Sequence, residues 1–255
     1  QVWLSATRKR NTTFEVTDTW PSLPPDIRPT YSTEYETVPF VYLPDRLAAP
    51  EEFTGRRKEL QELADWADDE GSRACLVYGD GGIGKTTLVL EFAHRLLEGR
   101  FPELAWRPDI ITFFSAKKTR WGIGGLERLS TENIGVVDLV RHMAMLLGPS
   151  ELDPDWYKGD ARKTIDRLAG LLGELKVNCR SHLIILDNTE TMIESIVERQ
   201  QLAKGISLLA RKIGRVVVTS RRAEVIEAHP VQIEPWSNDE SADYIKKRGR
   251  VLGCE

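Results

Sequence analysis

Eight consecutive residues, Gly79 to Thr86, have the types and the spacing that bind phosphate groups. They read Gly-Asp-Gly-Gly-Ile-Gly-Lys-Thr and match the pattern G-x-x-x-x-G-K-[S/T] at every fixed position. Glycines let backbone N–H groups converge on phosphate oxygens, and a helix expected to begin near Lys85 adds the positive end of its dipole. Lys85 is expected to contact the β- and γ-phosphates. The Thr86 hydroxyl is expected to ligate Mg²⁺, which prefers oxygen ligands.

An acidic residue follows a second apolar run, Leu183 to Leu186. Because ligands of open α/β sheets bind at the carboxyl ends of the strands, Asp187 is expected to hold Mg²⁺ through a water molecule. An aspartate at this place can also cap a helix, but the phosphate-binding loop upstream favours the metal role. Glu190 is the candidate for orienting or deprotonating an attacking water, because the Asn188 amide cannot act as a base.

Two arginines follow a third apolar run, in the sequence Thr219-Ser220-Arg221-Arg222. An arginine at the end of such a strand can reach a γ-phosphate and stabilise its charge. The alternative is a pair of solvated surface arginines.

The elements that must position these residues alternate along the chain. Apolar strands without polar alternation, separated by helices, predict a parallel sheet covered on both faces. Residues 121–130 contain glycines and are expected to form a loop. The expected strands are 74–78, 109–114, 182–186, 215–219 and 231–233, and the expected helices are 56–69, 85–98, 136–147, 161–175, 192–212 and 239–251.

The first fifty residues differ from the rest because seven prolines interrupt them. Proline fixes its own φ and disfavours helix at the preceding residue, so residues 1–50 are predicted to be an extended arm or linker. Residues 14–16 and 38–42 could form short edge strands. The predicted nucleotide-binding domain comprises residues 51–255, as a piece of a longer chain.

The composition is that of an ordinary globular protein. The chain has 255 residues, of which 41 % are hydrophobic and 29 % charged, and its net charge is −4. This balance makes nucleic acid an unlikely partner, although the basic residues 8–10 keep that hypothesis open. Three cysteines without metal or disulfide spacing, no signal peptide and no apolar run long enough for a membrane predict a cytoplasmic protein with no membrane contact.

Taken together, the motifs resemble the nucleotide-binding domain of the STAND NTPases, in particular the NB-ARC or AP-ATPase branch, which includes signalling and antiviral defence proteins. The resemblance covers about residues 50 to 250. It rests on Phe53-Thr54-Gly55-Arg56 as the hhGRE element, Gly81–Leu88 as the GGIGKTTL form, Leu186–Glu190 as a Walker B ending, Thr219–Arg221 as the TTR sensor, and Gln232–Ser237 as the short strand and proline turn.

The resemblance implies a three-layer α/β/α fold with a five-stranded parallel sheet of order 5-1-4-3-2. It implies binding of ATP or ADP, with Arg221 rather than Arg222 at the γ-phosphate. It also implies a switch between a closed ADP form and an open ATP form that self-associates, joined to effector and sensor domains outside these residues. The nucleotide-binding residues would be Phe53, Thr54, Gly55 and Arg56 at the adenine, and Gly79, Gly81, Gly82, Ile83, Gly84, Lys85, Thr86 and Thr87 at the phosphates.

Two residues depart from the family pattern: Arg57 replaces the acid of hhGRE, and Asn188 replaces the second acid of the usual Asp-Asp pair. Because of Asn188, slow hydrolysis is expected, with Lys85, Asp187, Glu190 and Arg221 as the catalytic candidates. The alternatives are an NTPase that turns over rapidly and a nucleic-acid-associated NTPase. A GTPase is disfavoured because the chain lacks an Asn-Lys-x-Asp motif.

Overall fold

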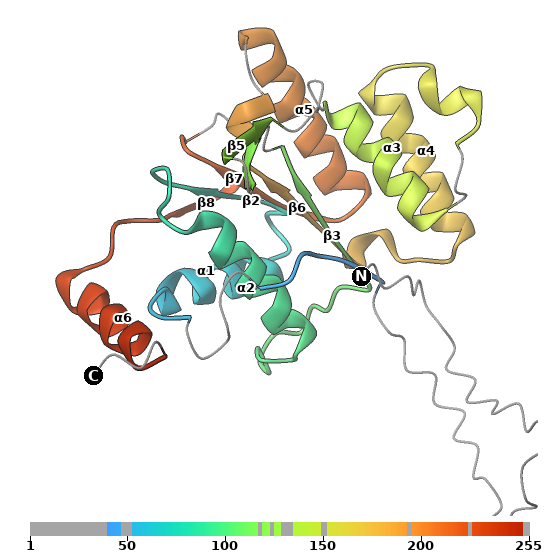
Figure 1. Cartoon of the computed structure of the whole chain (residues 1–255). Helices are drawn as coiled ribbons and strands as arrows, with labels where there is room; N and C mark the ends of the chain where they lie inside the picture. Colours follow the sequence, from blue (N-terminus) through green and yellow to red (C-terminus); the bar gives the residue numbers. More distant parts are fainter. Residues whose placement is uncertain are drawn as a thin grey trace, which may run out of the picture.

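The computed structural model describes residues 40–46, 53–116, 119–122, 125–128, 135–148, 152–192, 195–223 and 226–251. A parallel β-sheet lies between two layers of helices (Figure 1). The predicted three-layer α/β/α arrangement with a parallel sheet is therefore confirmed.

The central sheet has six parallel strands in the order β1-β3-β6-β7-β2-β8. The predicted five-stranded sheet is thus corrected to six strands. The additional strand, β1, pairs with the outer edge of β3, and without it the order reads β8-β2-β7-β6-β3. The strands are β1 (Phe40–Tyr42), β2 (Ala74–Tyr78), β3 (Ile110–Ser115), β6 (His182–Asp187), β7 (Arg215–Ser220) and β8 (His229–Gln232).

Strand β1 comes from the proline-rich segment that the sequence predicts to be an arm. The Phe40 amide donates to the Asp109 carbonyl at 2.8 Å, and the Phe40 side chain is only 1 % exposed. The edge strand expected within residues 38–42 is therefore present at residues 40–42. The other one, at residues 14–16, lies outside the described residues.

Each face of the sheet has its own hydrophobic core. Helices α1 (Arg57–Asp68) and α2 (Lys85–Leu97) cover one face, where Leu63, Val89 and Phe92 are fully buried. Helices α3 (Val136–Leu147), α4 (Ala161–Glu174) and α5 (Ile196–Lys212) cover the other. Helix α6 (Asn238–Val251) extends away from both layers at the carboxyl end of the described chain (Figure 1).

Two local predictions are wrong. Residues 121–130 were expected to be a loop, but β4 (Thr119–Gly122) and β5 (Gly125–Arg128) form an antiparallel hairpin there. The helix expected from residue 192 begins at Ile196, because Ser195 caps α5 and receives a hydrogen bond from the Glu198 amide. Residues 189–192 form a separate 3₁₀ turn, and similar turns lie at Pro154–Tyr157 and Cys179–Ser181.

Candidate functional site

The loop between β2 and α2 has the backbone that phosphate binding requires. Gly82 and Gly84 have φ angles of 81° and 99°, in the left-handed region that other residues rarely adopt. Gly79 lies close to Ile233, the residue that follows β8, so that a Cβ added at Gly79 would lie 2.5 Å from the Ile233 carbonyl oxygen. The glycines are therefore required by geometry as well as by the motif.

Lys85 is buried at the start of α2 and points back into this loop. Its Nζ donates to the carbonyl oxygens of Gly79 and Asp80, both at 2.8 Å. Burial lowers the pKa of Lys85 below its usual value, while the carboxylate of Glu190 opposes this shift. An anion bound in the loop would add a further negative charge beside the ammonium group and could replace these two carbonyl contacts.

Asp187, the last residue of β6, accepts four hydrogen bonds although it is only 2 % exposed. Oδ1 receives the hydroxyl protons of Thr86 and Thr219, each at 2.7 Å. Oδ2 receives Nδ2 of Asn188 at 2.6 Å and the hydroxyl of Ser115 at 3.2 Å. The sequence-predicted pair Thr86 and Asp187 is therefore in direct contact.

These residues fit a magnesium ion. The Thr86 hydroxyl and the Asp187 carboxylate are hard oxygen ligands beside a phosphate-binding loop, and Mg²⁺ is usually held by one or two such groups together with phosphates and water. The described residues contain no cluster of three or more His, Cys, Asp or Glu that could hold a metal on their own. Any ion here would depend on a bound phosphate for its other ligands.

Arg221 lies just beyond the end of β7 and faces the same loop. Its Nε lies 3.0 Å from Oε1 of Glu190, and its guanidinium carbon would lie 3.7 Å from a Cβ added at Gly81. The Arg221 side chain remains 65 % exposed, so it is free to reorient. Two catalytic candidates thus pair with each other.

A cavity of about 210 Å³ brings most of these groups together. Its lining residues are Gly81, Gly82, Gly84, Lys85, Thr86, Thr87, Asn188 and Arg221. It contains two cationic side chains and several backbone amides, which suits an anion.

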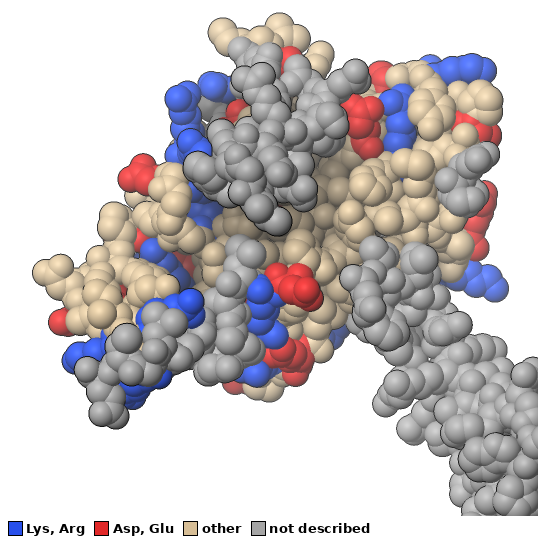
Figure 2. All heavy atoms as spheres, in the orientation of Figure 1, with Lys and Arg blue, Asp and Glu red and all other residues tan. Residues whose placement is uncertain are grey.

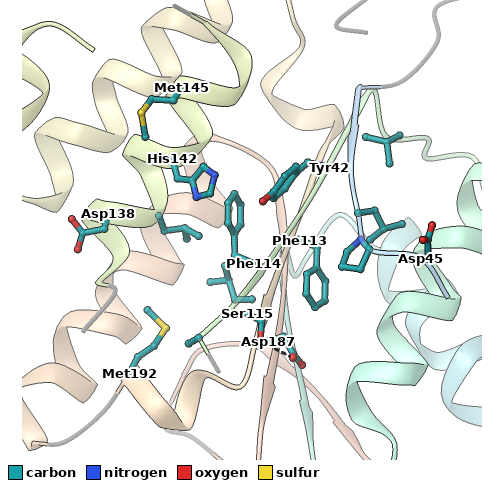
Figure 3. Close-up of a pocket in the computed structure, with 16 residues that line it drawn as sticks. Tyr42, Asp45, Phe113, Phe114, Ser115, Asp138, His142, Met145, Asp187 and Met192 are labelled. Carbon is teal, nitrogen blue, oxygen red and sulfur yellow. Dashed lines mark hydrogen bonds between the residues drawn. The ribbon is translucent and has the colours of Figure 1, made fainter. Parts of the chain in front are cut away.

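A larger cavity of about 720 Å³ lies next to it, between the carboxyl ends of β1, β3 and β6 and helix α3. Tyr42, Phe114 and His142 form an aromatic group there, with ring centroids 5.3 to 5.8 Å apart (Figure 3). Among the described residues its lining includes three aspartates and no lysine or arginine. Its charge therefore disfavours phosphate, and the smaller cavity is the better anion site despite its size.

The residues expected at the adenine are not among those that line either cavity. Arg56 is only 8 % exposed, and its guanidinium donates to Glu59 Oε1 at 2.8 Å, to the Glu234 carbonyl at 2.7 Å and to the Ile83 carbonyl at 3.3 Å. The Phe53 ring packs against the core, and the Arg95 guanidinium carbon lies over it, 5.4 Å from the ring centroid. In this conformation Arg56 ties α1 to the phosphate loop, and three of its five N–H donors are in use.

The structure adds two polar residues to the predicted site, Ser115 and Thr219, both of which donate to Asp187. Each ends or nearly ends a strand beside β6, so the predicted sheet order held a signal that could have found them.

Fold and site together define a P-loop ATPase. The chain belongs to a family described as "AAA ATPase domain", whose model matches residues 52–218. No helix in the described part of the chain is both long and apolar enough to cross a lipid bilayer.

Among solved structures, the Walker-type ATPase PABY2304 of Pyrococcus abyssi is similar with a TM-score of 0.52 and 15 % identity, over 81 % of this chain and 61 % of that one. The Aeropyrum pernix Orc1 protein, solved in complex with DNA, is similar with a TM-score of 0.53 and 18 % identity, over 79 % and 51 %. At these identities the likeness shows the fold alone.

A curated relative is the uncharacterized WD repeat-containing protein alr2800 of Nostoc sp. It is 28 % identical over 145 residues, which are 56 % of this chain and 10 % of that protein. The chain thus spans a small part of this relative and about half to three fifths of the two solved structures.

Proposed function

We propose that this AAA ATPase domain is the nucleotide switch of a STAND signalling or defence protein, of the NB-ARC type, which binds ATP or ADP with Mg²⁺ and hydrolyses ATP slowly. One observation carries the proposal: Lys85, Thr86 and Arg221 line one cavity at the phosphate loop, and Thr86 is bonded to Asp187. The family match supports nucleotide binding, and the five motifs quoted above support the STAND assignment.

The phosphate end can distinguish ATP from ADP through Arg221. In the structure this guanidinium pairs with Glu190 at the edge of the cavity. The oxygens of a γ-phosphate can accept two hydrogen bonds from the Arg221 guanidinium and so bind it more strongly than Glu190 does. ADP lacks this phosphate. Exchange of Glu190 for the γ-phosphate would therefore couple the ATP state to a rearrangement of the segment after β7.

We expect hydrolysis to be slow because of the residue that follows Asp187. Glu190 remains the candidate for positioning water, since it would be released from Arg221 when a γ-phosphate takes the guanidinium. The Asn188 side chain donates to Asp187 and cannot accept a proton as a base. When bound, Mg²⁺ would neutralise phosphate charge, and Lys85 would neutralise it from the other side.

Partners follow from the proposal. We expect self-association controlled by the nucleotide, and effector and sensor domains elsewhere in the full-length protein. The WD repeats named in the Nostoc relative support such a multidomain organisation.

Calorimetric titration with ATP, ADP and GTP tests the assignment, together with steady-state and single-turnover hydrolysis. We expect ATP and ADP to bind, GTP to compete poorly, and turnover to be slow. Equal competition by GTP would remove the adenine assignment, and fast steady-state turnover would replace the switch by an active ATPase.

A nucleic-acid-associated ATPase is the second candidate, because the Orc1 structure that shares this fold was solved with DNA. On the face shown in Figure 2, basic and acidic side chains are interspersed in small groups. A salt-dependent titration with duplex DNA decides between the two, since phosphate contacts give a steep dependence of affinity on salt.

A further inference from the structure

The buried hydroxyl of Thr219 lies between Asp187, the candidate residue for Mg²⁺, and the backbone amide of Asn188. Thr219 is 0 % exposed, belongs to β7, and precedes Arg221 by two residues. Its Oγ1 donates to Asp187 Oδ1 at 2.7 Å and accepts from the Asn188 amide at 3.0 Å.

The direction of these bonds is fixed. The Asn188 amide can only donate and an ionised carboxylate can only accept, so the hydroxyl accepts from Asn188 and gives its one proton to Asp187. Asn188 has a φ of 59°, which places its amide in a turn immediately after the strand. The backbone amide that follows β6 therefore orients the Thr219 hydroxyl, and this hydroxyl orients the Asp187 carboxylate.

Thr219 also continues the contact between two strands beyond their ladder. The paired register of β6 and β7 ends at Leu186 and Val218. Past this point the Thr219 hydroxyl bonds the end of β6, and the Thr189 hydroxyl, in the 3₁₀ turn after β6, donates to the Thr219 carbonyl at 3.1 Å.

The four donors on Asp187 are not equivalent. Thr86 lines the phosphate cavity, so its hydroxyl oxygen would be shared with a bound metal. Asn188 and Ser115 bond the other oxygen, Oδ2. Thr219 is fully buried in β7 and does not line that cavity, so it is the Oδ1 donor that a bound ligand leaves in place.

We propose that Thr219 is a positioning residue that holds Asp187 in the orientation required for Mg²⁺, and so sets how strongly Mg²⁺ enhances nucleotide binding. The inference rests on the proposed function, because it concerns the same site. Groups that orient a metal ligand typically contribute ten- to a hundredfold to metal affinity.

The test measures ADP affinity by calorimetry over a series of Mg²⁺ concentrations and in EDTA, for the wild type, Thr219→Val and Thr219→Ser. We expect Thr219→Val to need roughly ten- to a hundredfold more Mg²⁺ for the same enhancement, with unchanged affinity in EDTA. Thr219→Ser keeps the hydroxyl and should restore most of the enhancement. Thr189→Val is the matched control, since it removes a buried hydroxyl bonded to Thr219 that does not touch Asp187, and it should keep the wild-type Mg²⁺ dependence.

Circular dichroism and thermal unfolding accompany each titration, and Thr219→Ala replaces Thr219→Val if the valine variant does not fold. An equal loss with and without Mg²⁺, an unchanged Mg²⁺ dependence, or the same loss in Thr189→Val overturns the inference while leaving nucleotide binding intact. A wild-type domain that binds no nucleotide overturns the proposed function, and this inference with it.

Discussion

Strands β6 and β7 carry buried polar side chains at both of their ends, but the two ends use them differently. At the carboxyl end, the Asp187 carboxylate accepts from the hydroxyl of Thr219 and from that of Thr86, which lines the phosphate cavity. At the amino end, His182 bonds the hydroxyl of Thr112 at 2.9 Å, and Arg215 donates to the carbonyls of Trp66 and Ser72 at 3.2 and 3.1 Å.

At the amino end, Arg215 packs against aromatic rings. The Arg215 guanidinium lies 5.7 Å and 5.2 Å from the ring centroids of Trp66 and Trp106, and none of these residues lines a described cavity. Burial of a polar group is therefore not in itself a sign of function. What distinguishes the carboxyl end is that its bonds can be exchanged for bonds to a ligand. Substitutions at that end should thus change nucleotide binding, and substitutions at the amino end should change stability.

The largest effect is expected for Lys85→Ala. Loss of the ammonium group removes a charge-assisted contact to phosphate, so ATP and ADP affinity should fall more than about a hundredfold, or about 2.7 kcal/mol. Calorimetry measures the loss, and urea unfolding should show little change because the released carbonyls of Gly79 and Asp80 belong to a loop at the cavity. Unchanged ATP affinity would contradict the assignment of the loop.

Arg215→Leu should lower stability and leave nucleotide binding nearly unchanged, the opposite of Lys85→Ala. Two carbonyl acceptors lose a charged donor in a buried site, which should cost about 2–3 kcal/mol of unfolding free energy. Nucleotide affinity of the folded variant should stay near that of the wild type. Urea denaturation and calorimetry on the same sample check both statements, and a selective loss of binding would end the contrast between the two ends.

Arg221→Ala should weaken the binding of ATP but not that of ADP. Loss of the contact to the γ-phosphate corresponds to about 1.5–3 kcal/mol, or roughly ten- to a hundredfold in ATP affinity, while ADP affinity stays nearly constant. Arg222→Ala is the matched control, because that side chain does not line the phosphate cavity. A parallel loss of ATP and ADP, or a larger ATP loss in the control, means that the wrong role or the wrong arginine has been chosen.

The smallest effect concerns pH and His182. Complete burial lowers the pKa of His182 from 6.5 to about 3. The unfolded chain therefore binds a proton below pH 6.5 that the folded chain does not, so this contribution to stability is complete above pH 6.5 and is lost as the pH falls toward 3. Between pH 7.5 and 5.5 the loss from this group should be about 1.4 kcal/mol, and His182→Gln should lack that part of the pH dependence. Urea denaturation measures the unfolding free energy at each pH. The same fall between pH 7.5 and 5.5 in the wild type and in His182→Gln would contradict this prediction.

The phosphate end of the site could be predicted from the sequence because its signal is local. The loop, Lys85 and Thr86 are contiguous, and Asp187 directly follows a recognisable strand. The environment of Arg56 could not be predicted, since its bond to the Glu234 carbonyl joins residues 178 positions apart. Side-chain packing of this kind depends on the tertiary fold.

Strand β1 was expected as a short edge strand but was left out of the predicted sheet, and the β4–β5 hairpin was predicted to be a loop. A three-residue strand among prolines has almost no periodicity, and its pairing partner lies seventy residues away at Ile110. The glycines at positions 122 and 125 indicated a loop, but the structure pairs them with each other at the ends of β4 and β5. Thr219 was within a recognised motif, but its bond to Asp187 becomes visible only when β6 and β7 lie side by side.

Strand β1 also determines how the edge of the sheet meets other molecules. Without it, the backbone of β3 at residues 110–112 would present unpaired N–H and C=O groups, a template for strands of other chains. With it, the outermost strand has three residues and lies between Pro39 and Pro44, which cannot donate backbone hydrogen bonds. On this side the described sheet thus ends in a short strand flanked by prolines, which is a poor template for pairing with the strand of another chain.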